Sequence, residues 1–186
     1  MALGPHRIGP RLAGKAPAGK LPSARASGKI PLVNDPTLHI VLYQPEIPYN
    51  AGAAGRTCVA LGAKLWLVRP LGFRIDDRQL KRAGLDYWPH LDWEAVDDWE
   101  MLIRRLPERR PWLFSKTAGR PYTAARFEPG DVLVFGSESQ GLPRRVLDQD
   151  PDRCLRIPIR PQARSLNLSV SVGVIAFEAQ RQWAAE

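Results

Sequence analysis

The sequence predicts an α/β fold, with a mainly parallel sheet flanked by helices on both faces. Short apolar runs recur along the chain and alternate with segments of helical pattern, which is the arrangement of consecutive βαβ units. Of the 186 residues, 44% are hydrophobic and 25% are charged, as is usual for a globular chain. The length suits one folded domain with a substantial core.

The first half of this domain is expected to hold two strands around a helix. Residues 38–43 form an apolar run, and a second one occupies 64–68. Between them, Asn50 is expected to N-cap a helix that continues to about Leu61. Gly62 would end that helix, because glycine readily adopts the left-handed conformation found beyond helix C-termini.

The second half continues the alternation. A charged helix is expected at about 76–82, ended by Gly84, and a longer helix at about 94–106, ended by Pro107. The remaining elements are three strands and a short helix that has proline in its first turn. These strands are expected at 111–116, 132–135 and 154–159, and the short helix at 143–148.

The last segment, residues 166–183, fits two patterns. Alternate apolar residues would suit a strand, whereas Leu168, Val172 and Ile175 lie on one stripe of a helix. The length favours a helix, because strands are usually much shorter. The apolar face is wide, which fits burial against a second subunit as well as a well-buried terminal helix.

Residues 1–36 differ in composition from residues 37–186, which form the expected domain. Of the net charge of +8, this segment carries a large share, with six Lys or Arg against Asp35 alone, and it is rich in Gly, Ala and Pro. Such a segment is expected to be a disordered basic extension. It would act as a sequence-independent phosphate-binding arm, or be a solvated extension or the product of a start codon placed too early.

Several classes of protein are excluded by what the sequence lacks. No run approaches the roughly 18 apolar residues of a membrane span, so we expect a soluble protein. Cys58 and Cys154 are far apart and outside any Cys-x-x-Cys pair, which predicts reduced thiols in a reducing compartment, the cytoplasm. The three histidines lack metal-ligand spacing, and neither a Walker motif nor a nucleophile elbow is present. No metal site is expected.

Three polar loops each join a strand to the next element. They span residues 45–56, 132–143 and 156–169, and each follows or contains an apolar run and is punctuated by glycine or proline. In alternating α/β chains, ligands bind at the carboxyl ends of strands and beside helix starts. The sequence therefore predicts one composite site made of the three loops.

In order and spacing, these loops resemble the three signature motifs of the SPOUT class of RNA methyltransferases, in its SpoU branch. The resemblance covers residues 38–183. The compact chain, together with Gly72-Phe73 and the run at 81–87, looks like the TrmL type, which 2′-O-methylates the wobble cytidine or uridine in the tRNA anticodon loop. It implies a C-terminal trefoil knot, a homodimer formed through the first and last helices, and S-adenosyl-L-methionine as cofactor. The alternatives are a SPOUT enzyme acting on ribosomal RNA and an idle knotted RNA-binding module.

The resemblance also assigns cofactor contacts. Gly136 and Gly141 are expected to let the backbone approach the ligand closely, and Ile157 and Leu166 to form apolar walls. Ser165 and Asn167 would hold the ribose or the methionine end. The cofactor-binding residues implied in this way are Phe114, Ser115, Gly136, Gly141, Ile157, Ser165, Leu166 and Asn167.

For catalysis, the resemblance implies Asn50, Arg56, Glu138 and Ser165. Because guanidinium stays protonated, Arg56 is expected to clamp a phosphate and stabilise the developing 2′-oxyanion instead of acting as a base. Glu138 would accept the proton or bind the backbone amides of the turn. The expected RNA-binding residues are Arg56, Arg74, Arg78, Lys81, Arg82 and Arg164, and for the 76–82 segment a solvated face is the alternative.

Overall fold

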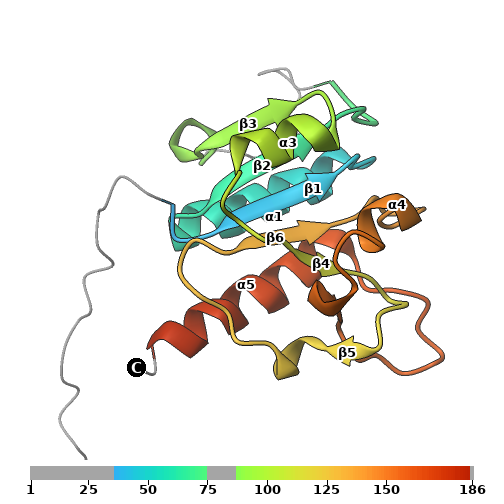
Figure 1. The fold of residues 1–186 in the computed structure, drawn as a ribbon. Coiled ribbons are helices and arrows are strands. Elements are labelled where there is room, and N and C mark those ends of the chain that lie inside the picture. Colours follow the sequence, from blue (N-terminus) through green and yellow to red (C-terminus); the bar gives the residue numbers. More distant parts are fainter. Residues whose placement is uncertain (1–35, 75–86, 185–186) are drawn as a thin grey trace, which may run out of the picture. The chain divides into compact units, whose positions relative to one another are not determined.

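The computed structural model describes residues 36–74 and 87–184 (Figure 1). Within them, seven strands form one sheet in the order β3-β2-β1-β6-β4-β7-β5, and every pair of neighbours is parallel. This confirms the predicted fold class; the trefoil knot stays a prediction. The strands are β1 (His39–Tyr43), β2 (Lys64–Val68), β3 (Trp93–Val96), β4 (Trp112–Phe114), β5 (Arg120–Pro121), β6 (Val132–Phe135) and β7 (Cys154–Arg156).

Helices cover both faces of the sheet (Figure 1). Successive strand side chains point to opposite faces, so Ile40 and Leu42 pack with α1 and α5, whereas Val41 packs with α3 and α4. In the described ranges, the α-helices are α1 (Pro48–Leu61), α3 (Trp99–Arg105), α4 (Arg144–Leu147) and α5 (Leu168–Ala184). Three 3₁₀ turns, η1 (Trp88–His90), η2 (Tyr122–Ala124) and η3 (Pro151–Arg153), complete the described elements.

The centre of the sheet determines where ligands can bind. All five residues of β1 are buried, between β2 on one side and β6 on the other. The chain builds outward from β1 to β2 and β3, and later places β6, β4 and β7 on the opposite side. In open α/β sheets, the crevice outside the carboxyl ends of strands at such a reversal is where ligands bind.

The first helix ends as predicted but begins differently. Gly62 follows α1 with φ of 68°, the left-handed conformation expected of a terminating glycine. Asn50, however, is not the N-cap: α1 starts at Pro48, and Ile47 occupies the cap position without a side-chain hydrogen bond. Proline is well suited to the first helical position, and the side chain of Asn50 is left for long-range contacts.

The predicted helix at 94–106 was wrong in its first part. Residues 93–96 form β3, and α3 starts at Trp99 after Asp98, whose side chain accepts a hydrogen bond from the Met101 amide at 2.6 Å. This aspartate cap marks the true helix start. The strands β4 and β7 are shorter than predicted, and Pro143 sits at the cap of α4.

The remaining predictions concern the C-terminal segment, the two cysteines and two segments that are largely outside the described residues. The final segment is the helix α5, as its length indicated. Cys58 is buried, which raises the pKa of its thiol far above the ordinary value, and neither Cys58 nor Cys154 forms a disulfide. The 76–82 helix and nearly all of the 1–36 extension lie outside the described residues. Within the described ranges, no helix has the length and apolarity needed to cross a bilayer.

Candidate functional site

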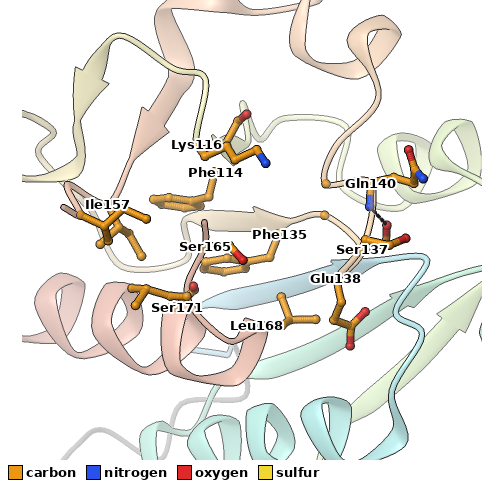
Figure 2. A pocket seen from close by; sticks show the side chains of 16 residues that line it. Phe114, Lys116, Phe135, Ser137, Glu138, Gln140, Ile157, Ser165, Leu168 and Ser171 are labelled. Carbon is orange, nitrogen blue, oxygen red and sulfur yellow. Dashed lines mark hydrogen bonds between the residues drawn. The ribbon is translucent and has the colours of Figure 1, made fainter. Parts of the chain in front are cut away.

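A cavity of about 190 Å³ lies at the carboxyl ends of β4, β6 and β7 (Figure 2). The loops after these three strands and the start of α5 enclose it, so residues from positions 114 to 171 meet in one place. The second and third of the three predicted loops line this cavity, whereas no residue of the first loop, 45–56, does. Of the predicted site residues, the cavity is lined by Phe114, Ser115, Gly136, Glu138, Gly141, Ile157, Ser165 and Leu166.

The floor of the cavity is aromatic. Phe114 and Phe135 are opposite each other in the parallel pair β4–β6, and their rings stack with centroids 4.7 Å apart and planes 10° apart. Ile157 and Ser165 line the same cavity as the two rings (Figure 2). The amide of Ser115 donates to the carbonyl of Leu155 at 2.9 Å, which fixes the end of β4 against β7. A flat apolar surface bordered by hydroxyl groups suits a heteroaromatic ring.

The loop after β6 closes on itself. The Gly141 amide donates to the carbonyl of Ser137 at 2.9 Å, and the Gln140 amide donates to the Ser137 hydroxyl at 3.2 Å (Figure 2). A Cβ atom on Gly136 would lie 2.1 Å from the carbonyl carbon of Gly141 and 2.2 Å from the amide nitrogen of Leu142. Gly141 has φ of +70°. The two glycines are therefore required by loop closure and backbone conformation. Both also line the cavity, and their close approach to a ligand stays a prediction.

Glu138 joins the second loop to the first. Its carboxylate accepts hydrogen bonds from the backbone amides of Glu46 at 2.8 Å and Ile47 at 3.2 Å, and from Nδ2 of Asn50 at 2.7 Å. These amides lie at the N-terminus of α1, where N–H groups lack helical partners and a negative charge is favourable. Of the two predicted roles for Glu138, the geometry favours binding of backbone amides, those of the first loop.

Asn50 and Asn167 extend this contact to the third loop. Asn50 is 6% exposed, and its Oδ1 accepts a hydrogen bond from Nδ2 of Asn167 at 2.8 Å. Oδ1 of Asn167 in turn accepts from the amides of Ser169 at 2.9 Å and Val170 at 3.3 Å, as an N-cap of α5 does. We call this the Glu138–Asn50–Asn167 chain. Neither Asn50 nor Asn167 lines the cavity; both hold its walls together.

Arg56 lies on the exposed side of α1, away from the cavity lining. Its guanidinium carbon is 4.8 Å from the centre of the Tyr87 ring, and the Tyr87 hydroxyl donates a hydrogen bond to the carbonyl of Gly52. The aromatic ring therefore orients the arginine through a cation–π contact. A single chain does not bring Arg56 together with the residues of the cavity.

The other predicted RNA contacts are only partly described. Arg74 and Arg164 are exposed, and Arg164 belongs to the loop that borders the cavity. Arg78, Lys81 and Arg82 lie outside the described residues. Tyr49 is 68% exposed and so accessible to RNA, whereas Trp99 is 2% exposed and packs in the core.

Some lining residues were missing from the predicted set. Lys116 lies two residues beyond the carboxyl end of β4, and Leu168 and Ser171 share one face of the first turn of α5. Spacing from the predicted elements could therefore have identified them. Groups of His, Cys, Asp and Glu able to hold a metal are absent from the described ranges. The lining residues not predicted are Lys116, Phe135, Ser137, Ser139, Gln140, Ile159, Leu168 and Ser171.

Comparisons with known proteins identify a matching family, similar sequences and similar structures. The model of the SpoU rRNA Methylase family matches residues 37–177. A protein of Methylovorus glucosotrophus named tRNA (cytidine(34)-2′-O)-methyltransferase is 45% identical over 144 residues, which are 77% of this chain and 94% of that protein. A solved structure concerned with the 2-OH methylation of C/U34 on tRNA is 51% identical, with a TM-score of 0.75 over 80% of this chain and 97% of that one. An AdoMet-bound rRNA methyltransferase from Sinorhizobium meliloti is 25% identical, with a TM-score of 0.69 over 79% of this chain and 57% of that one.

Proposed function

Because this chain belongs to the SpoU methylase family, we propose that it transfers the methyl group of S-adenosyl-L-methionine to a tRNA. The acceptor is the ribose 2′-hydroxyl of the wobble nucleotide, position 34 of the anticodon loop. The observation that carries this proposal is the cavity at the carboxyl ends of β4, β6 and β7. Its lining comes largely from the second and third loops, which resemble two of the SpoU signature motifs. The names of the similar proteins support the same reaction.

The cavity residues fit the cofactor. The stacked Phe114 and Phe135 rings and the side chain of Ile157 offer an apolar slot for the adenine, and the 136–141 loop offers backbone amides and serine hydroxyls to the ribose. A volume of about 190 Å³ is below the ~300–1,000 Å³ of cavities that enclose a whole drug-sized ligand. Part of the cofactor would therefore lie outside it, along the exposed 158–167 loop.

Bound S-adenosyl-L-methionine supplies a methyl group already activated by the sulfonium. The protein's task is then to hold the 2′-hydroxyl in line with that group and to stabilise the negative charge that develops on its oxygen. Arg56 stays protonated, so it binds a phosphate and the developing oxyanion. The Glu138–Asn50–Asn167 chain keeps the three loops in position and does not itself move a proton.

A homodimer would bring Arg56 to the site. Along one face of α5, Val170, Val174 and Phe177 are 51%, 36% and 51% exposed, and near the start of α1, Ile47 is 44% exposed. The two helices pack against each other, and exposed large apolar side chains on such neighbouring elements are of the kind that marks a subunit interface. A second copy on this surface would complete the RNA site. We also place the protein in the cytoplasm, where its free thiols stay reduced.

The experiment that tests the proposed function compares RNA from the source organism with and without this gene. Mapping of 2′-O-methyl groups should show the loss of methylation at position 34 of one or more tRNAs and its return on complementation. Loss of a ribosomal RNA methyl group instead would support the alternative substrate. An unchanged map for both RNA classes would support an idle RNA-binding module.

A further inference from the structure

A second cavity, of about 700 Å³, lies on the other side of the 137–141 loop. We call it the β1 cavity, because the end of β1 borders it together with the 70–72 and 140–144 segments. It shares Ser137, Gln140 and Gly141 with the cofactor cavity, so that one loop separates the two spaces. The β1 cavity lies outside the carboxyl ends of β1 and β6, where the strand order of the sheet reverses.

The walls of the β1 cavity combine apolar and neutral polar groups. Tyr43 and Leu142 are 4% and 6% exposed, and Leu71 is half-buried, so one side of the cavity is apolar. Gln44 and Gln140 contribute amide groups. Nε2 of Gln44 donates to the carbonyl of Arg69 at 3.4 Å, and its Oε1 has no hydrogen-bond partner in the part of the chain that is described.

Charge is distributed unevenly around the cavity. Glu46 lines it and accepts a hydrogen bond from the hydroxyl of Ser139. At the rim, the Arg144 side chain is 91% exposed, and its nearest acid, Asp148, is 3.9 Å away. An anion would be repelled by Glu46 inside the cavity and attracted by Arg144 at its edge. The interior thus suits a neutral polar ring, and the rim suits a phosphate.

The cavity is preformed by close backbone contacts. The Gly72 amide donates to the carbonyl of Pro45 at 2.9 Å, and a Cβ atom on Gly72 would lie 2.7 Å from Cα of Glu46. Gln44 has φ of 51°, which is uncommon for a residue other than glycine, and its amide donates to the carbonyl of Val68 at 2.9 Å. Backbone held in such a conformation is frequent at ligand-binding positions.

We propose that the β1 cavity receives the base of the nucleotide that is methylated, a proposal that rests on the proposed function. Its ribose would lie across the 137–141 loop, close to the cofactor cavity, and its phosphate at Arg144. Bases of single-stranded loops are recognised by hydrogen bonds to their edges and by apolar contact. The amides of Gln44 and Gln140, each with a donor and an acceptor, would supply the hydrogen bonds to the base edge. Apolar contact would come from Tyr43, Leu71 and Leu142.

The test is a coupling experiment with protein saturated with S-adenosylhomocysteine. The dissociation constant is measured for an anticodon stem-loop RNA and for the same RNA lacking the target base but keeping its 2′-hydroxyl. Gln44→Leu should weaken binding of the intact RNA about fivefold, as loss of one hydrogen bond does. It should leave binding of the abasic RNA nearly unchanged, because the substitution and the removal of the base each delete the same hydrogen bond between Gln44 and the base. An equal loss on both RNAs, or no loss on either, would overturn the proposal.

Arg144→Ala provides a second measurement, at an exposed position where the substitution should not affect folding. It should weaken both RNAs about fivefold and reduce the salt dependence of binding, whereas Arg104→Ala, the same charge loss on exposed α3, should change neither. Equal effects of the two arginine variants would contradict the phosphate assignment. Methyl transfer is measured separately. If Gln44→Leu weakens only the intact RNA but the protein transfers no methyl group, the proposed function is refuted and the base site is not. If the protein transfers a methyl group but Gln44→Leu does not distinguish the two RNAs, only the base site is refuted, and an RNA that does not bind refutes both.

Discussion

Replacing Glu138 with alanine tests whether this carboxylate holds the loops together or accepts a proton. The change removes three hydrogen bonds, to the amides of Glu46 and Ile47 and to Nδ2 of Asn50. Ile47 is 44% exposed, so water can replace the bond to its amide. Asn50 is 6% exposed, so its side-chain amide would be left unsatisfied at a cost of about 1–3 kcal/mol.

Two smaller losses add to this cost. The amide of half-buried Glu46 loses a charge-assisted bond worth about 1 kcal/mol, and the N-terminus of α1 loses a favourable charge worth about 0.3–1 kcal/mol. We expect Glu138→Ala to lower the free energy of unfolding by about 3 kcal/mol, close to 6–12 °C in Tm for a domain of this size. Glu138→Gln, which keeps one acceptor oxygen, should cost about half as much.

The assay is urea unfolding of wild type and variants at one protein concentration, since association would shift the midpoint. Glu108→Ala, an exposed carboxylate after α3, serves as the control and should leave the midpoint unchanged. Methyl transfer is then measured with the variants at a temperature where they are folded. If Glu138→Gln retains wild-type stability and loses 10²–10⁴-fold in rate, the carboxylate is a general base and the structural assignment is refuted.

Four further predictions concern the site, the RNA contact, the interface and the response to acid. Gly136→Ala should weaken S-adenosylhomocysteine binding at least about fivefold in calorimetry, because its Cβ would overlap the 141–142 backbone; Gly119→Ala, where a Cβ meets no atom within 4 Å, should not. Arg56→Ala should keep cofactor affinity and lose about 10²–10³ in rate, with partial rescue by lysine; wild-type turnover would contradict the catalytic role. Phe177→Glu should give a monomer in sedimentation, and an unchanged dimer would exclude this face. Hydrogen bonds from neighbouring side chains lower the pKa of Glu178 to about 2, so its stabilisation is present above pH ~4.3 and is lost as the pH falls towards 2; acid titration of Glu178→Gln should lack that component.

Local signals in the sequence predicted most of the fold. The apolar run of β1, the glycine after α1 and the length of α5 are all properties of neighbouring residues, and each was confirmed. The strand β3 was missed because it is a short, half-buried edge strand containing Glu94, whose pattern merges with that of the following helix. The aspartate cap at Asp98 was the signal that separates them.

Local signals could not show how the predicted residues divide their tasks. Asn50 was interpreted as a helix cap, yet its partners Glu138 and Asn167 are 88 and 117 residues away in the chain. Likewise, the reason for glycine at position 136 depends on the backbone of residues 141–142 folding back on it. Such contacts exist only after the sheet has brought three loops to one edge, so spacing identified the site but not its internal connections.

Methyl transfer to the 2′-hydroxyl of nucleotide 34 is tested most directly by an in vitro reaction followed by mass spectrometry. Purified protein, S-adenosyl-L-methionine and an unmodified tRNA transcript should yield a product one methyl heavier, with the mass located on the ribose of nucleotide 34. The same transcript with a 2′-deoxyribose at that position should gain no methyl group. Methylation of the deoxy transcript, of a base, or of another nucleotide would contradict the account.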